Sequence, residues 1–324
     1  MERIDTHCHI VPTGWRKWCE KYGWEKPDGM PVIPKWSSEA HITLMEKLNI
    51  KRSILSITSP GTHLKANDFE LARQVTRETN DEIAQAHREY PDKFSFFASL
   101  PLPDVDGSLQ EIDRVRDMPG CCGFALMTNA QGHYLGDDIY GPVFAKLNER
   151  PTVIFMHPTE CCSIKNPDTE KPLPQYPTPM LEYYFDTTRA VVNLLLTETP
   201  TRYSNLTFLV SHCGAALAPL VERVGVFSTS LLKGNAKLSS DALKELLRTR
   251  FYFDLAGFPF PDLIHGYLRF GDTSRLLYGS DYPYTPQPLV ENLARFMDDN
   301  VQELFSEDAR AAIYHGNAER LFHF

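Results

Sequence analysis

The histidines His7 and His9 are the first residues of this chain whose types and spacing could perform chemistry. Arg3–His9 is predicted to be a strand, and residues two apart in a strand point to the same side. Both imidazoles should therefore face one way, while Cys8 faces the other. Neutral imidazoles are common ligands of divalent metals. Two histidines on the protein surface could have the same spacing. The interpretation of His7 and His9 as metal ligands therefore depends on the rest of the chain.

Three further residues of ligand type, His157, His212 and Asp281, stand at the ends of other apolar, strand-like runs. In a barrel of parallel strands, the carboxyl ends of the strands meet at one mouth. His212 could instead be a helix-terminus or core histidine, and Asp281 could be the N-cap of the last helix. Their shared position at strand ends favours a common site over these readings.

Eight strand-like runs alternate with helical ones, a pattern typical of a parallel sheet and, at this number, of a closed barrel. We therefore predict an α/β fold, a single (β/α)8 TIM barrel over residues 1–324. The strands are expected at Arg3–His9, Arg52–Ile57, Phe94–Leu100, Cys122–Met127, Thr152–His157, Leu206–Ser211, Phe251–Leu255 and Arg275–Gly279.

Two segments interrupt this alternation. An aromatic insertion at residues 10–36 follows the first strand and contains all four tryptophans. It could form a flap over the barrel mouth or plug one end of the barrel, and its departure directly from His9 favours the flap. A proline-rich insertion, Thr159–Pro179, follows the fifth strand and is predicted to be a loop over one end.

Composition restricts the class of protein. The 324 residues are 42% hydrophobic and 23% charged, with a net charge of −9, which is ordinary for a globular protein and unfavourable for nucleic-acid binding. The seven cysteines have no spacing typical of a zinc ribbon or a disulfide framework. The chain shows neither a signal peptide nor an apolar run of about 18 residues, so we expect a cytoplasmic protein without membrane partners.

Several stretches resemble the amidohydrolase superfamily, and more narrowly the branch named for 2-amino-3-carboxymuconate-semialdehyde decarboxylase, which includes metal-dependent non-oxidative decarboxylases. The matching stretches are IDTHCHIVP, FFASLPL, VIFMHP, LVSHCGAALAPLVERV, LLYGSDYP and HGNAERLF. The resemblance implies that one divalent ion is bound by His7, His9, His157 and Asp281. It also implies a catalytic or substrate-orienting role for His212.

The donor set favours some metals over others. Three imidazoles suit zinc, and the carboxylate also admits manganese, so we expect Zn²⁺ first and Mn²⁺ as the alternative. The fourth predicted strand offers no lysine for carboxylation in the stretch Gly123-Phe124-Ala125-Leu126, which fits a site with one metal ion.

Within the branch, the stretch Phe185-Asp186-Thr187-Thr188-Arg189 is most similar to the 6-methylsalicylate decarboxylases. The resemblance implies a carboxy-lyase that acts on an aromatic ortho-hydroxy acid, with conversion of 6-methylsalicylate to 3-methylphenol (m-cresol) and CO2 as the first expectation. The branch's name-giving enzyme has an arginine that grips the substrate in the helix before the second strand. This chain has Ala40-His41-Ile42-Thr43 there, which favours a monocarboxylate.

Two routes remain open for the reaction. Asp281 could carry a proton to the ring carbon, alone or with His212, or metal-activated water could add to the substrate with His212 as the base. The same site would also serve a hydrolase of a lactone or amide, and a non-catalytic metal-binding protein is the third class.

Substrate contacts are expected from aromatic residues near the last strands. Phe258, Phe260 and Tyr282 could sandwich an aromatic acid or simply pack their loops. Arg189 could grip a carboxylate or pair with Asp186. A homodimer is also expected, because the insertions and the C-terminal tail are rich in apolar and aromatic residues.

Overall fold

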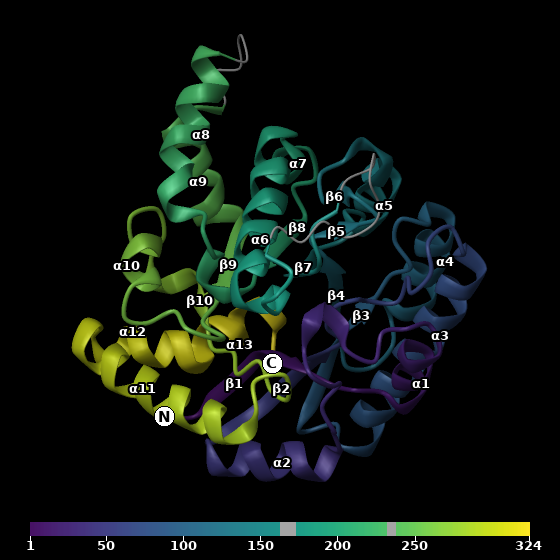
Figure 1. Cartoon of the computed structure of the whole chain (residues 1–324). Coiled ribbons are helices and arrows are strands. Elements are labelled where there is room, and N and C mark those ends of the chain that lie inside the picture. Colours follow the sequence, from purple (N-terminus) through teal and green to yellow (C-terminus); the bar gives the residue numbers. More distant parts are fainter. Residues whose placement is uncertain (163–172, 232–237) are drawn as a thin grey trace.

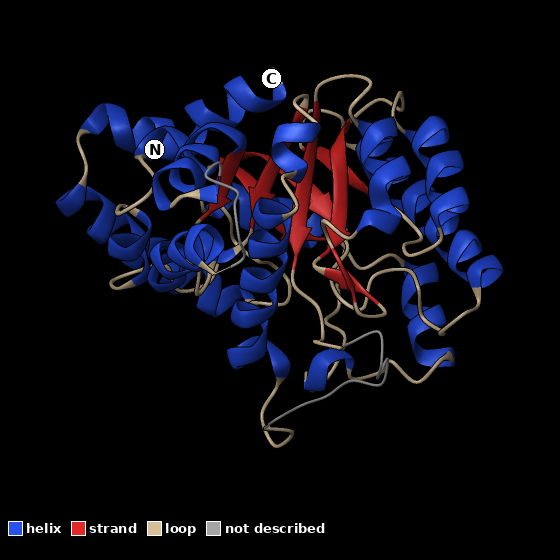
Figure 2. Ribbon diagram, turned by 90° about the horizontal axis from the view of Figure 1, so that it is seen from above, coloured by secondary structure: helices blue, strands red, loops and turns tan. Residues whose placement is uncertain are grey.

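Eight parallel strands form a barrel at the centre of the molecule, and helices surround it (Figures 1 and 2). The structure is a computed structural model that describes residues 1–162, 173–231 and 238–324. The strands pair in the order β1-β2-β3-β4-β7-β8-β9-β10. They are β1 (Arg3–His9), β2 (Ile50–Ser56), β3 (Phe94–Ser99), β4 (Cys121–Met127), β7 (Thr152–His157), β8 (Leu206–Val210), β9 (Phe251–Asp254) and β10 (Leu276–Leu277).

Backbone hydrogen bonds between β1 and the segment after β10 close the barrel. The amide of Thr6 donates to the carbonyl of Tyr278 over 2.9 Å, and the amide of Asp281 donates to the carbonyl of His7 over 2.8 Å. The (β/α)8 barrel predicted from the sequence is thereby confirmed. Its closure places the first strand beside the loop that carries Asp281.

Side chains on alternate positions of the strands fill two separate cores. Along β7, Val153 and Phe155 point into the barrel, whereas Ile154 and Met156 pack outward beneath the helices. The same alternation directs His157 inward at the carboxyl end of the strand. The inner core consists of Ile4, Ile54, Phe97, Ala125, Val153, Phe155, Leu209, Tyr252, Leu277 and Ala318.

Polar caps mark the starts of the helices that follow the early strands. The Ser37 hydroxyl accepts from the amide of Ala40 at the start of α2 (Ser38–Lys47), and Asp68 accepts from Leu71 at the start of α3 (Phe69–Glu89). The outer layer continues with α4 (Val105–Val115), α5 (Gly141–Leu147), α6 (Thr178–Leu196), α7 (Thr199–Arg202), α8 (Ala218–Ser230), α9 (Ser240–Arg250), α10 (Leu263–Tyr267), α11 (Gln287–Leu304), α12 (Glu307–Ala311) and α13 (Asn317–Phe322). Helices α8 and α9 project from the barrel at the top of Figure 1. None of the helices in the described ranges is long and apolar enough to cross a membrane.

The aromatic insertion, residues 10–36, contains α1 (Thr13–Lys21) and the short 3₁₀ turn η1 (Pro27–Gly29). Its α1 packs against α3, and the turn lines the cavity described below. Residues 163–172 of the proline-rich insertion lie outside the described residues. A small hairpin of β5 (Asn129–Ala130) and β6 (His133–Tyr134) follows β4.

Candidate active site

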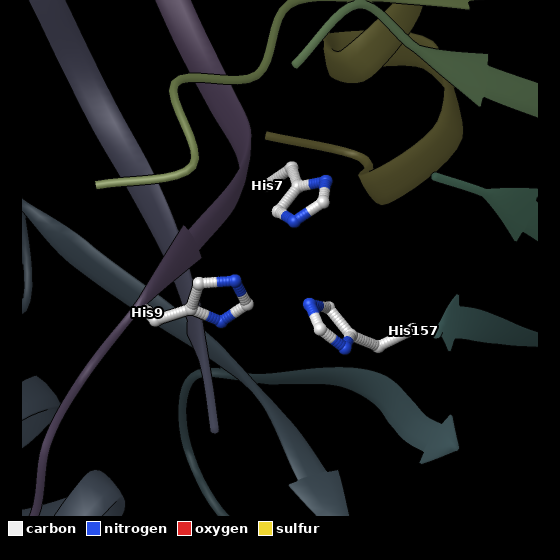
Figure 3. A group of neighbouring side chains, drawn as sticks. All are labelled: His7, His9 and His157. Carbon is white, nitrogen blue, oxygen red and sulfur yellow. The ribbon is translucent and has the colours of Figure 1, made fainter. Parts of the chain in front are cut away.

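Three histidines converge at the mouth of the barrel (Figure 3). His7 and His9 come from β1 and His157 from the end of β7, and each offers a ring nitrogen within 4.8 Å of those of the other two. All three side chains are buried. In β1 the pairing with β2 is irregular between Asp5 and Cys8. Such irregularities re-aim side chains beside active sites.

Hydrogen bonds orient all three rings in the same way. The Nδ1 of His7 donates to Asp254 Oδ2 over 2.9 Å, and that of His157 donates to the carbonyl of Pro158 over 2.7 Å. The Nδ1 of His9 lies 3.2 Å from the hydroxyl of Ser56, which is itself placed to donate to the Cys8 carbonyl. When a ring is in the neutral form with Nδ1 protonated, the lone pair on its Nε2 faces the centre of the site.

A divalent metal ion fits this donor set. Among the described residues, the buried Nε2 atoms of His7 and His9 have no hydrogen-bond partner, so without a ligand each would be an unsatisfied polar group in the interior. Burial lowers the pKa of His9, and burial together with the neighbouring His9 and His7 lowers the pKa of His157 well below the usual value. Both rings therefore favour the neutral form that binds metals.

Asp281 brings a carboxylate to the same point. Its Oδ1 lies 3.2 Å from His9 Nε2 and 3.6 Å from His7 Nε2, while Thr285 donates to its Oδ2 over 3.0 Å. Burial favours the protonated acid, but His9 and His7 outweigh burial and lower the pKa of Asp281. Asp281 does not cap the last long helix, because the N-cap of α11 is Pro286.

His212 follows β8 and completes the cluster. Its ring centroid lies 5.0 Å from that of His7, and its buried Nδ1 has no hydrogen-bond partner in the part of the chain that the structure describes. His212, His7 and Asp281 form a second group whose ligand atoms lie within 4.8 Å of one another. Burial, followed by the charge of His7, lowers the pKa of His212 to about 4, so the ring is neutral near pH 7 and can accept a proton.

The sequence prediction missed Asp254, at the end of β9, which connects the two groups. Its Oδ2 accepts from His7, and its Oδ1 accepts from the backbone amides of His212 and Ala256. Burial alone would raise the pKa of this carboxyl, but the nearby His7 lowers it. Strand alternation was the signal in the sequence. Tyr252 points into the barrel, and Asp254, two residues further along the same strand, must point the same way.

A cavity of about 230 Å³ opens above these residues. Its size lies at the small end for ligand sites and suits a single-ring molecule. Its walls include His157, His212, Asp281, Asp28, Tyr183, Tyr184, Tyr284 and Phe258. The Tyr284 ring packs edge-on against His9, with 5.5 Å between centroids. Acid–base groups and aromatic surface are therefore combined in one buried space.

Of the four residues predicted to contact substrate, only Phe258 lines this cavity, and it is 59% exposed. Phe260 is 5% exposed and packs in the outer core, because its loop turns it under the barrel's helices. Tyr282 packs against His41, with 5.1 Å between ring centroids. Arg189 lies 3.8 Å from Asp186 and lines a different, surface hollow. Phe260, Tyr282 and Arg189 are thus not among the residues that line this cavity, and a role for them in substrate binding stays a prediction.

Comparison with known proteins identifies the family. The sequence matches the family model for amidohydrolases over residues 4–324, and the chain belongs to this family. It is 32% identical to decarboxylase yanB of Aspergillus niger, over 99% of this chain and 88% of that protein. It is 30% identical to 6-methylsalicylic acid decarboxylase of Penicillium expansum, over 99% of this chain and 96% of that protein. The resemblance to the superfamily and to its decarboxylase branch is confirmed.

A solved structure shows the same fold. The dihydroxybenzoic acid decarboxylase of Polaromonas, determined with bound manganese and the inhibitor 2-nitroresorcinol, superposes with a TM-score of 0.80. The two sequences are 17% identical, and the match covers 99% of this chain and 97% of the other.

Proposed function

We propose that this protein is a metal-dependent non-oxidative decarboxylase of an aromatic ortho-hydroxy acid, with 6-methylsalicylate as the first candidate substrate. The observation that carries the proposal is the buried cluster of His7, His9, His157 and Asp281, which opens into a cavity of about 230 Å³. The decarboxylases among its relatives, including one that acts on 6-methylsalicylic acid, support the reaction and the substrate class.

His7, His9, His157 and Asp281 would hold the metal ion. When bound, the ion would supply positive charge that orients the carboxylate and the ortho-oxygen of the substrate. Three imidazoles favour Zn²⁺, whereas the manganese in the Polaromonas structure favours the alternative, so the proposal includes both ions. Metal analysis of protein purified without added metal distinguishes them.

The side chains around the ring would move the proton. Asp281 has a lowered pKa and His212 is neutral near pH 7, so both begin without the proton that the ring carbon must receive. They would first take it from the ortho-hydroxyl group or from water, and then deliver it to the carbon that bears the carboxylate. The C–C bond to the carboxylate then breaks and CO2 leaves. The electron pair of that bond returns to the ring and restores its aromaticity.

Product analysis tests this proposal. Protein loaded with Zn²⁺ or Mn²⁺ is incubated with 6-methylsalicylate, and we expect m-cresol and CO2 in equal amounts, with neither from chelator-treated protein. A panel of hydroxybenzoates, lactones and amides run in parallel tests the hydrolase alternative. Hydrolysis of a lactone or amide without release of CO2 from any hydroxybenzoate would contradict the decarboxylase proposal.

A further inference from the structure

The turn that carries Asp281 has an unfavourable backbone conformation. Asp281 has a φ of 58°, in the left-handed region that residues other than glycine rarely adopt. Such a conformation persists only where surrounding contacts hold it. Two of these contacts come from β1, because the amides of Ser280 and Asp281 both donate to the carbonyl of His7, over 3.1 and 2.8 Å. The conformation of the turn therefore depends on its junction with β1.

Asp5 adds a side-chain contact across this junction. The residue is fully buried, and its Oδ1 accepts from the amide of His7 over 3.2 Å and from the amide of Ser280 over 3.1 Å. His7 lies in the irregular stretch of the pairing between β1 and β2, between Asp5 and Cys8. In that stretch the side chain of Asp5 supplies the acceptor for the His7 amide. One carboxylate oxygen thus holds the two segments that carry His7 and Asp281.

Gly279 allows the turn to approach β1 closely. A β-carbon added at this position would lie 2.8 Å from the β-carbon of His7 and 3.1 Å from that of Ala256. The first distance is too short for two β-carbons, so any larger residue would push the turn away from β1. The spacing between His7 and the turn is therefore set by two features, the hydrogen bonds to Asp5 and the missing side chain of Gly279.

A different role for Asp5, as a ligand in a second metal site, does not fit its neighbours. Ligand-type atoms of Asp5, Cys8 and His41 lie within 4.8 Å of one another. His41 is neutral, because burial lowers its pKa to about 3. The Nε1–H of Trp36 donates to His41 Nδ1 over 3.0 Å, so Nε2 carries the proton and can donate to the Ser53 hydroxyl, 3.2 Å away. The His41 ring therefore keeps no lone pair for a metal ion.

We propose that Asp5 is a positioning residue that holds His7 and Asp281 at the spacing that a shared metal ion requires. His7 Nε2 and Asp281 Oδ1 lie 3.6 Å apart. Asp5 acts on this distance through the backbone amides of His7 and Ser280. The inference rests on the proposed function in one respect, since it takes the metal-ligand cluster to be His7, His9, His157 and Asp281.

Binding of Co²⁺ tests this role, because the visible absorption of the ion depends on the geometry of its ligands. Dissociation constants of Co²⁺ and Zn²⁺ are measured by competition with a chelator on the full-length protein, and the Co²⁺ spectrum is recorded beside them. We expect Asp5→Ala to bind both ions about 10-fold to 100-fold more weakly and to shift the Co²⁺ bands. Asp5→Asn keeps an oxygen that can accept from both amides, so its affinity should lie within about threefold of wild type.

Gly279→Ala is the second variant, which separates the turn from β1 while Asp5 is retained. It should weaken metal binding and shift the bands in the same direction as Asp5→Ala. Asp104→Ala is the matched control. Asp104 is also a buried carboxylate, and it accepts from the amide of Gly107 over 3.0 Å. Its loss should lower the free energy of unfolding and leave the affinity and the spectrum of Co²⁺ unchanged.

Wild-type affinity and bands in Asp5→Ala or in Gly279→Ala would overturn the inference. So would an equal change in Asp104→Ala, or an Asp5→Asn variant that binds metal as weakly as Asp5→Ala. The expected changes in metal binding, found in a protein that turns over no hydroxybenzoate, would support the positioning role and contradict the proposed reaction.

Discussion

Asp254 shows how one carboxylate can prepare two histidines for different tasks. It accepts from the ring of His7 and from the backbone amide of His212. The first contact fixes the protonation of a ring whose other nitrogen faces the metal-ligand cluster, and the second holds the backbone that carries His212. Substitution of His7 and of His212 can therefore separate a proposed ligand from a proposed proton carrier, because the two residues contact different oxygens of the same carboxylate.

Three substitutions distinguish the ligands from the proton carriers. Asp281→Asn keeps an oxygen that can contact the ion but cannot exchange a proton, so turnover should fall about 100-fold to 10,000-fold while much of the metal affinity remains. His7→Ala removes a ligand and should lose metal and activity together. His212→Ala should keep the metal and lose most of the turnover. Metal content and initial rates are measured on the same preparations.

A near-native rate in Asp281→Asn would contradict the role of Asp281 in proton transfer. Loss of metal from His212→Ala would place this residue among the ligands instead. Far-ultraviolet circular dichroism of each variant serves as the control for folding.

The sequence was sufficient to find the residues of the cluster but not the walls of its cavity. Strand alternation and strand ends are local signals, so the sequence alone predicts His7, His9, His157 and Asp281 at one mouth of the barrel. The cavity walls depend on how loops turn, and such turns are set by contacts distant in sequence. Phe258 and Phe260 are two residues apart, yet one lines the cavity and the other is buried in the outer core.

At the scale of elements, the aromatic insertion is held by its first helix. Proline precedes α1 and offers no side-chain cap, so the carboxylate of Glu82 in α3 accepts from the amides of Thr13 and Gly14 over 2.8 and 2.7 Å. The Trp15 ring is fully buried, and its Nε1 donates to the carbonyl of Gly61 over 2.8 Å. Within the insertion, α1 is therefore packed into the fold against α3, while η1 forms part of the cavity wall.

Trp15→Ala should lower the free energy of unfolding by about 3–5 kcal/mol, because it leaves a cavity and an unpaired carbonyl. Urea unfolding monitored by circular dichroism measures the loss. Trp18→Ala, on the same helix but only partly buried, is the matched control and should cost less. An equal decrease in the free energy of unfolding in the two variants would contradict a larger stabilising contribution from the Trp15 ring.

Helix and strand periods predicted most elements, and the differences have local causes. The apolar face of α3 (Phe69–Glu89) is long and regular, so the helical period in the sequence is clear over its whole length. In contrast, α4 begins at Val105, where Asp104 caps it by accepting from the amide of Gly107. A glycine in the first turn weakens the helical signal at this start, although an aspartate before a helix is itself a cap signal.

At the scale of the whole molecule, the proposed metal site joins parts of the barrel that are remote in sequence. His7 and His9 belong to the first strand, His157 to β7, and Asp281 to the loop where the barrel closes. A bound ion would therefore connect the two ends of the sheet with its middle. The unfolded chain has no preformed arrangement of these ligands, so metal binding should stabilise the fold.

Removal of the metal should consequently lower the melting temperature of the entire barrel. At an ion concentration of about 100 times the dissociation constant, binding adds about 2.7 kcal/mol to the stability of the native state. For a chain of this size, that corresponds to a decrease of several degrees, roughly 5 °C, after chelation. Calorimetry of metal-loaded, chelated and reconstituted protein measures the shift, and reconstitution with Zn²⁺ or Mn²⁺ should reverse it. His7→Ala is the control, since its melting temperature should respond little to chelation. The same melting temperature before and after complete removal of the ion from wild-type protein would contradict a metal site that spans the barrel.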